Sequence, residues 1–188
     1  MAIRLPKSRS RGKLPRMTRS HRHDASPTPY TLRDPRPGDY GWMVSVHGEL
    51  YAHEYGWDSR FEALVADVAG AFARRHDPRR ERCWIAEVHG ARVGSVMVVQ
   101  HPDRPDVAKL RLLLVLPAAR GLGLGKRLVQ ECTTFARQAG YRRIALWTNS
   151  VLTVARALYV ADGYALVHSE PHDHFGDGLV GETWEKVL

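Results

Sequence analysis

The residues best suited to chemistry form the segment Arg120-Gly121-Leu122-Gly123-Leu124-Gly125-Lys126, which lies between a hydrophobic run and an amphipathic one. Three alternating glycines at the start of a helix leave backbone N–H groups without partners and without neighbouring Cβ atoms. The helix dipole favours negative charge there, and an arginine fork matches phosphate oxygens. The segment therefore predicts a phosphate site, with a pyrophosphate as the natural ligand. The alternative is a glycine-rich turn that only packs a strand on a helix.

Two common phosphate-binding motifs do not fit this segment. A P-loop requires Gly, four residues and then Gly-Lys-Ser/Thr, but Arg120 occupies its first position and Arg127 its last. A dinucleotide fingerprint requires Gly-x-Gly-x-x-Gly, and Lys126 takes the place of its third glycine. No Asp or Glu lies between Glu131 and Asp162, where its acidic ribose ligand would fall. Hydrolysis of a magnesium nucleotide and binding of NAD are therefore not expected.

The hydrophobic pattern predicts the elements that position this loop: a strand, two helices, three strands, a helix, a strand, a helix and two strands. The first helix precedes residue 59, and Ser59 with Glu62 forms a predicted capping box for the second. The run 112–116 lacks alternation, as is typical of a central strand buried on both faces. This order predicts one α/β domain with a mixed sheet. The other expected ranges are 30–33, 59–72, 83–88, 93–99, 109–116, 124–139, 144–147, 151–158, 164–168 and 182–188.

Composition excludes several other classes of protein. The chain has 188 residues, of which 44% are hydrophobic and 26% charged, as expected of a globular domain. No apolar run approaches the roughly 18 residues of a membrane span, and no apolar core of a secretory signal is found near the N-terminus. Cys83 and Cys132 lie inside apolar periodic segments, as expected of buried thiols rather than a disulfide. These features predict a cytoplasmic protein without a membrane partner.

The formal charge of +8 comes entirely from one end of the chain. Residues 1–23 contain eight Lys and Arg and no Asp or Glu, and the remaining 165 residues contain 20 charges of each sign. We expect residues 1–26 to be a disordered basic tail and residues 27–188 to be the folded domain. The tail resembles a nucleic-acid arm or a targeting peptide in composition, but we favour a linker, or an extension upstream of a true start near Met17. Nucleic-acid binding is expected at most weakly, through this tail.

Arg-x-x-Gly-x-Gly after a strand ending in Val-x-Pro, together with Ala155-Arg156-Ala157-Leu158-Tyr159 and Gly163-Tyr164, resembles the GNAT superfamily of N-acetyltransferases over roughly residues 28–188. The resemblance implies a mixed, mostly antiparallel sheet with a splayed central strand and helices on both faces. A closer similarity is to the acetyltransferase half of proteins that fuse a MarR-type winged helix to such a domain. That similarity rests on segments 55–57, 146–149 and 181–184. With no room for the winged helix, DNA binding is not expected to carry over.

The resemblance also implies acetyl-CoA as co-substrate and a set of residues that bind it. The backbone of Leu114, Val115 and Leu116 would hold the pantetheine arm and polarise the thioester carbonyl. The amides of Leu122, Gly123, Leu124, Gly125 and Lys126, with Gly121 and Arg120, would hold the pyrophosphate. Leu152 replaces the asparagine of the common pattern, so Asn149 either contacts the cofactor instead or caps the following helix.

The resemblance further implies direct attack of an amine on the thioester, with Tyr159 as the group that donates a proton to the leaving thiolate. A core tyrosine is the alternative reading of Tyr159. No carboxylate lies between Asp106 and Glu131, so the expected strand offers no general base. Glu54, within an aromatic-rich segment, is our first candidate for the base, and His174 is the second. Water is the remaining alternative.

The acceptor is expected between the first two helices and the C-terminal hairpin, where aromatic and histidine side chains gather. His172 and His174 lack a third clear ligand, so no metal site is expected. The predicted function is acetyl-CoA-dependent acetylation of a primary amine, with small molecules favoured over proteins. A non-catalytic acyl-CoA-binding regulatory module is the alternative. The sequence leaves the acceptor and homodimer formation open.

Overall fold

The computed structural model describes residues 29–188, so the basic tail predicted for residues 1–26 lies outside the described residues. In this part of the chain no helix is long and apolar enough to cross a membrane. The strands are β1 (Thr31–Arg33), β2 (Arg82–Val88), β3 (Ala91–Gln100), β4 (Val107–Val115), β5 (Arg143–Asn149), β6 (Ala165–His172) and β7 (Leu179–Val187). The helices are α1 (Asp39–Tyr55), α2 (Ser59–Arg75), α3 (Leu124–Gln138), α4 (Thr153–Ala161) and the short 3₁₀ helix η1 (Pro117–Ala119).

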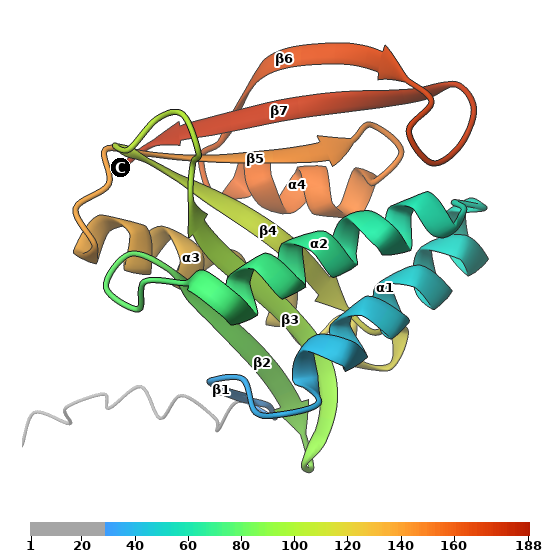
Figure 1. The fold of residues 1–188 in the computed structure, drawn as a ribbon, viewed down its shortest axis with the longest axis horizontal. Helices are drawn as coiled ribbons and strands as arrows, with labels where there is room; N and C mark the ends of the chain where they lie inside the picture. The colour runs from blue at the N-terminus through green and yellow to red at the C-terminus, as the bar shows by residue number, and fades with distance from the viewer. Residues whose placement is uncertain (1–28) are drawn as a thin grey trace, which may run out of the picture.

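The strands form one mixed sheet in the order β1-β2-β3-β4-β5-β7-β6 (Figure 1). Every neighbouring pair is antiparallel except β4 and β5, which run parallel. A parallel pair needs a crossover connection, and α3 supplies it between these two strands. The sheet therefore confirms the mixed, mostly antiparallel architecture.

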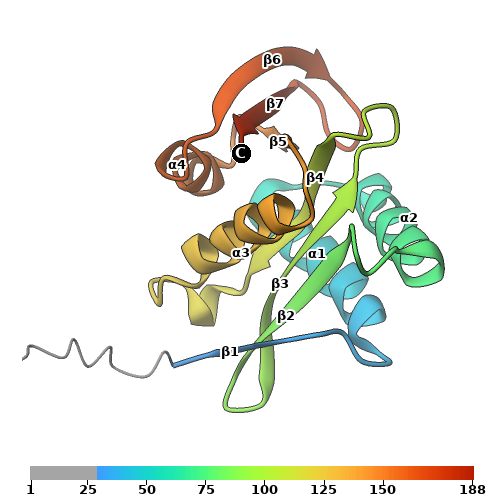
Figure 2. The same cartoon turned by 90° about the vertical axis from the view of Figure 1, so that its left-hand side faces the viewer.

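Helices cover both faces of the sheet, as Figure 2 shows. One face packs on α3 and α4 through a large core that includes Leu128, Cys132 and Tyr159. The other face packs on α1 and α2 through a second core that includes Met43, Phe72 and Met97. The α2 stripe predicted from the sequence explains the second core, since Val65, Ala69 and Phe72 are its buried residues.

The central strands β4 and β5 separate after a short paired stretch. Their register joins only residues 107–109 to residues 143–145, although β4 continues to Val115 and β5 to Asn149. Leu112 has a positive φ of 51°, and the β3–β4 register shifts beside it, as at a bulge. The Ser95 hydroxyl donates to the Leu112 carbonyl at 3.2 Å and holds this bend. The splayed central strand is therefore confirmed, and its far half has no strand on the β5 side.

The order of elements matches the sequence prediction, but some boundaries differ for local reasons. The cap of α2 is Asp58, whose carboxylate accepts the Arg60 N–H at 2.9 Å, so the predicted capping box at Ser59 is wrong. β4 ends at Val115 rather than residue 116, because Pro117 begins η1 there. β6 continues past the predicted residue 168 to His172, and β7 begins at Leu179 instead of residue 182, because the two strands pair as far as His172 and Leu179. Both cysteines are buried and free, as predicted.

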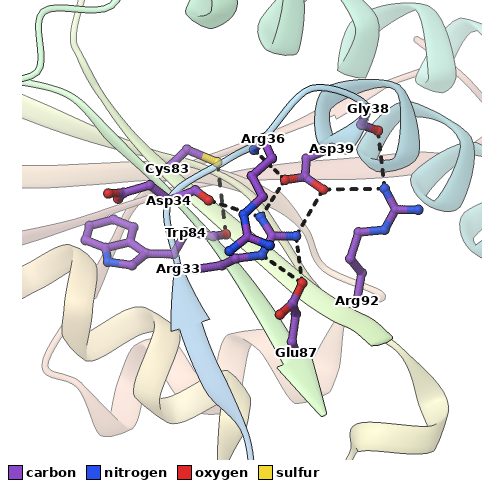
Figure 3. A network of polar contacts seen from close by, with 9 residues as sticks. All are labelled: Arg33, Asp34, Arg36, Gly38, Asp39, Cys83, Trp84, Glu87 and Arg92. Carbon is purple, nitrogen blue, oxygen red and sulfur yellow. Dashed lines mark hydrogen bonds and ion pairs between the residues drawn. The ribbon is translucent and has the colours of Figure 1, made fainter. Parts of the chain in front are cut away.

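A network of ion pairs fixes the start of α1 to the β1–β2 edge of the sheet (Figure 3). The buried Asp39 carboxylate accepts hydrogen bonds from the Arg33 guanidinium at 2.6 and 3.2 Å and from the Arg36 N–H at 2.6 Å. Arg33 also donates to Glu87 at 2.7 Å, and Arg92 approaches Asp39 at 3.4 Å. α1 supplies residues that line the two cavities described below. The network therefore determines where those residues lie relative to the sheet.

Replacing Asp39 with asparagine is expected to lower the free energy of unfolding by roughly 1–3 kcal/mol, because it leaves buried donors unpaired. Burial alone would raise the pKa of Asp39, but the hydrogen bonds from Arg33 and Arg36 outweigh it and the pKa is lowered. A lowered pKa adds stability only above the unfolded value of about 3.9 and loses it as pH falls further. The difference in the free energy of unfolding between the wild type and Asp39→Asn should therefore stay constant near neutral pH and shrink in acid.

Urea unfolding from about pH 7 down to about pH 3 measures this dependence. Asp77→Asn is the matched control, since Asp77 pairs with Arg79 on the exposed surface at 3.0 Å. That change should have a much smaller effect on stability, because an exposed ion pair is screened by solvent. Equal effects of the two changes would show that the Asp39 network does not hold α1.

Candidate active site

The predicted phosphate loop lies between η1 and α3. Gly121 and Gly123 have φ angles of 82° and 73°, a backbone region that glycine adopts without strain. The backbone N–H groups of residues 121–126 make no hydrogen bond within residues 29–188, and the first helical bond runs from the Arg127 N–H to the Gly123 carbonyl. Six consecutive free amides at a helix N-terminus fit an anionic group with several oxygens.

A cavity of about 440 Å³ opens at this loop. It is lined by the predicted residues Leu114, Val115, Arg120, Gly121, Gly123, Leu124, Gly125 and Lys126, and by parts of α1 and α4. Leu116 and Leu122 do not line it: the Leu116 N–H bonds to the Val93 carbonyl, and Leu122 is 40% exposed. The cavity thus joins the loop to the half of β4 that has no strand on the side of β5.

Glu54 lies in this same cavity, beside the loop. Its two carboxylate oxygens accept hydrogen bonds from the Arg120 guanidinium at 2.7 and 3.0 Å. The side chain of Arg120 is 49% exposed and that of Glu54 21%. Glu54 does not line the second cavity described below, so the geometry does not support its expected role as the base for an amine bound there.

A second cavity of about 290 Å³ lies between β4 and β5, beneath α1 and α2. Tyr159, Asn149 and His174 of the predicted site line it. Its walls are largely apolar and aromatic and include Trp57, Phe61 and Trp147, which belong to one aromatic cluster. A cavity of this size and lining suits a small molecule.

The two cavities meet at four residues that line both of them: Tyr51, Leu113, Leu152 and Ala155. Tyr51 comes from α1, Leu113 from the splayed half of β4, and the other two from the start of α4. A group carried into one cavity can therefore reach a molecule held in the other. The sequence did not identify Leu113, because its place beside the bulge depends on how β4 bends.

Tyr159 stands near this junction. It is buried, and its hydroxyl makes no hydrogen bond to another residue of the described chain, so the proton is free to be donated. Burial raises the pKa of Tyr159, and the neighbouring Tyr51 raises it further, so the phenol stays protonated at neutral pH. Burial raises the pKa of Tyr51 as well. Tyr51 is thus a second phenol at the junction, which the sequence placed only among the aromatics of the acceptor side.

Asn149 and the histidines His172 and His174 form a hydrogen-bonded chain, of which Asn149 and His174 line the second cavity. The His174 N–H donates to Nδ1 of His172 at 3.2 Å, and Nε2 of His172 donates to the Asn149 side-chain oxygen at 2.9 Å. Burial and the neighbouring His174 lower the pKa of His172, in keeping with this neutral form. Asn149 does not cap α4, whose N-cap is Leu152. Asn149 also lies away from the cavity at the loop.

The geometry suits a class of protein that binds a phosphate-bearing co-substrate beside a second cavity, at a gap between two strands. The chain matches the Acetyltransferase (GNAT) family over residues 40–164. An uncharacterized N-acetyltransferase of Schizosaccharomyces pombe is 30% identical over 125 residues, which are 66% of this chain and 74% of that protein. N-acetylaspartate synthetase of Danio rerio is 28% identical over 67% of this chain, which spans 44% of that relative.

Solved structures show the same fold at low sequence identity. A GCN5-related N-acetyltransferase from Kribbella flavida superposes with a TM-score of 0.68 at 23% identity, covering 87% of this chain and all of that one. A phosphinothricin acetyltransferase from Sinorhizobium meliloti, solved with acetyl-CoA, gives 0.67 at 20% identity and covers 85% of this chain and 89% of that one.

The chain belongs to the Acetyltransferase (GNAT) family. Membership makes it an acyltransferase of the N-acetyltransferase type that uses acetyl-CoA as co-substrate. The free amides of residues 121–126, with Arg120 beside them, are chemically suited to the pyrophosphate of that co-substrate.

Proposed function

We propose that this enzyme transfers the acetyl group of acetyl-CoA to the primary amine of a small molecule, by direct attack while both are bound. The observation that carries the proposal is the meeting of the two cavities at Tyr51, Leu113, Leu152 and Ala155. Two bound molecules that share one junction need no covalent carrier on the protein. The volume of the second cavity, about 290 Å³, and its aromatic lining favour a small molecule over a protein side chain as the acceptor.

The cofactor residues have distinct roles in this proposal. The amides of Gly121, Leu122, Gly123, Leu124, Gly125 and Lys126, together with Arg120, hold the pyrophosphate. The backbone of Leu114 and Val115 holds the pantetheine arm, because β4 has no strand partner there on the side of β5. Leu116, expected to share this role, lies outside the cavity, with its N–H bonded to the Val93 carbonyl. Acetyl-CoA supplies an activated acetyl thioester, and the chain supplies position and proton transfer.

Tyr159 donates the proton to the thiolate that leaves, and His174 accepts the proton that the amine must lose. Tyr159 fits because its hydroxyl is protonated, unbonded and near the junction. His174 fits better than Glu54 because it lines the acceptor cavity, whereas Glu54 is held by Arg120. A neutral imidazole carries a ring nitrogen lone pair that can accept a proton from an amine.

Replacing Glu54 with glutamine is expected to tighten acetyl-CoA binding by up to about fivefold, because a carboxylate that competes with the pyrophosphate for Arg120 is removed. Turnover at saturating acetyl-CoA should change little. Titration calorimetry and initial rates measure the two quantities. Glu49→Gln is the control on the same helix, since Glu49 bonds Ser45 on the exposed surface. If Glu54→Gln instead lost most of its turnover, and its rate profile against pH lost the lower-pH limb, Glu54 would be the general base.

Initial rates over a grid of acetyl-CoA and amine concentrations test the direct transfer. Lines that intersect in the double-reciprocal plot are expected, because both substrates must be bound before either product leaves. Parallel lines would indicate an acetylated enzyme and contradict the proposal. Binding of acetyl-CoA with no acetylation of any amine would favour a non-catalytic acyl-CoA-binding regulatory module. A cytoplasmic location, a homodimer and the closer similarity to the winged-helix fusion proteins stay predictions from the sequence.

A further inference from the structure

Two cations of β4 face the acceptor cavity, and the transfer chemistry does not use either of them. Lys109 pairs with Val99 and Arg111 with Met97 across the β3–β4 ladder. Residues directly opposite each other in a ladder point to the same face of the sheet. Met97 belongs to the core beneath α1 and α2, so Lys109 and Arg111 also point to that face. Both residues line the acceptor cavity.

Neither cation has an anionic partner in the described part of the chain. No hydrogen bond or ion pair joins Lys109 or Arg111 to another residue there, and none of the residues that line the acceptor cavity is an aspartate or a glutamate. Asp103 acts on Lys109 only at longer range. By contrast, Arg156 of α4, which lines neither cavity, is held by Glu182 at 2.9 Å.

These cations are partly buried, which makes the lack of a partner costly. Burial lowers the pKa of Lys109 and that of Arg111. The positive charge of Arg111, two residues along the same strand, lowers the pKa of Lys109 further. Side chains two residues apart on one strand lie roughly 6.6 Å apart at their bases. A buried charge is normally paired, so an anion in the cavity would relieve both desolvation and repulsion.

The lining of the cavity offers two polar atoms that are also without partners. Nδ1 of His47 donates to the Met43 carbonyl at 2.7 Å, and burial lowers the pKa of His47 to about 4, so Nε2 is left as a lone-pair acceptor. Nε2 of His47 and Nε1 of Trp57 are buried and have no hydrogen-bond partner within residues 29–188. His47 is 2% exposed and Trp57 4%. His47 and Trp57 line the acceptor cavity together with Lys109 and Arg111, so an acceptor for an N–H and a further donor belong to the same lining.

Resting on the proposed function, we propose that the acceptor is an α-amino acid with an apolar side chain. Its carboxylate is held by Arg111 and Lys109, and its amine lies toward Nε2 of His47 and the junction of the two cavities. An arginine matches a carboxylate with two parallel hydrogen bonds, and a lysine adds a point charge. The side chain of the amino acid packs against the aromatic side chains of Trp57, Phe61 and Trp147, which line the cavity.

The test compares amino acids with the amines that lack only their carboxylate. L-Leucine is paired with 3-methylbutylamine and L-phenylalanine with 2-phenylethylamine, and release of the CoA thiol is measured at saturating acetyl-CoA. The amino acid of each pair should have a kcat/KM higher by roughly tenfold to a hundredfold, the size expected for a charge-assisted hydrogen bond. Arg111→Met should remove most of this preference, Lys109→Met part of it, and Arg111→Lys should keep more of it than Arg111→Met.

Controls separate a lost contact from a lost fold. Arg142→Met removes an exposed arginine outside both cavities and should leave the preference unchanged. Thermal stabilisation by acetyl-CoA should be equal in all variants, which shows that each is folded and binds its co-substrate. Equal rates for amine and amino acid, or an unchanged preference in Arg111→Met, would overturn the inference while the proposed function stood.

Further outcomes are also decisive. If acetyl-CoA binds but none of the four acceptors is acetylated, the assignment to apolar amino acids is overturned. If phosphorylated amines such as phosphoethanolamine are acetylated and the amino acids are not, the cations serve a phosphate and the carboxylate assignment fails. If acetyl-CoA neither binds nor is consumed with any acceptor, the proposed function itself fails.

Discussion

Gly123→Val is expected to abolish acetyl-CoA binding and with it all acetyl transfer. Gly123 is the N-cap of α3, with a φ of 73°, and a branched side chain is strained in that region. The valine would also stand among the free amides that are suited to the pyrophosphate. Acetyl-CoA at a hundredfold excess over its dissociation constant should stabilise the wild-type protein by about 2.7 kcal/mol. The variant should show none of this stabilisation.

Gly90→Val is the matched control for the loop. Gly90 also has a positive φ, of 80°, and open space where a Cβ would stand, but it lies in the β2–β3 hairpin. Both changes should therefore cost a similar backbone strain of about 1–2 kcal/mol. Thermal unfolding with and without acetyl-CoA separates them, because only Gly123→Val should lose the ligand-dependent shift. A normal shift in Gly123→Val would contradict the loop assignment.

Tyr159→Phe is expected to lower turnover by about a hundredfold or more while leaving acetyl-CoA affinity nearly unchanged. The change removes only the hydroxyl, and the ring keeps its place in the core of α3 and α4. Since burial raises the pKa of Tyr159, the phenol holds its proton until a strong base forms beside it. The leaving thiolate is such a base, and without the phenol its departure loses general acid assistance.

Tyr164→Phe is the matched control for the phenol. Tyr164 is buried like Tyr159, with ring centroids 5.8 Å apart, but it lines neither cavity. Pre-steady-state rates of CoA release measure the chemical step in each variant, and calorimetry measures the affinity. The two variants should have similar stability and affinity and differ in turnover. Wild-type chemistry in Tyr159→Phe would make Tyr159 a core residue, and Tyr51 would be the next phenol to test.

The sequence predicted the order of elements because each has a strong periodic signal. The stripe on α2, the apolar run of β4 and the glycine that follows α3 determine type and order with little help from tertiary contacts. Boundaries were less well predicted, since they depend on caps and neighbours. Asp58 replaced Ser59 as the cap, and β6 is defined by pairing with β7 rather than by its own pattern.

The site was predicted unevenly for a similar physical reason. The loop at Arg120–Lys126 carries its chemistry in contiguous residues, so its spacing was readable. The acceptor cavity is assembled from α1, α2, β4, β5 and α4, and only the folded chain brings them together. Glu54 was placed in the acceptor site because its neighbours are aromatic, but α1 directs its carboxylate to Arg120. The sequence pattern does not mark Lys109 and Arg111 as residues of the acceptor site, because charged residues on a strand usually face solvent.

Direct acetyl transfer to an amine is tested most directly with acetyl-CoA that carries a heavy-isotope acetyl group. The purified protein is incubated with this co-substrate and a mixture of the common α-amino acids and their decarboxylated amines. Mass spectrometry should find a heavy N-acetyl product in an amount equal to the free CoA released, and Gly123→Val should form none. Acetyl-CoA binding without any product above the uncatalysed background would contradict the enzyme assignment and leave a binding module.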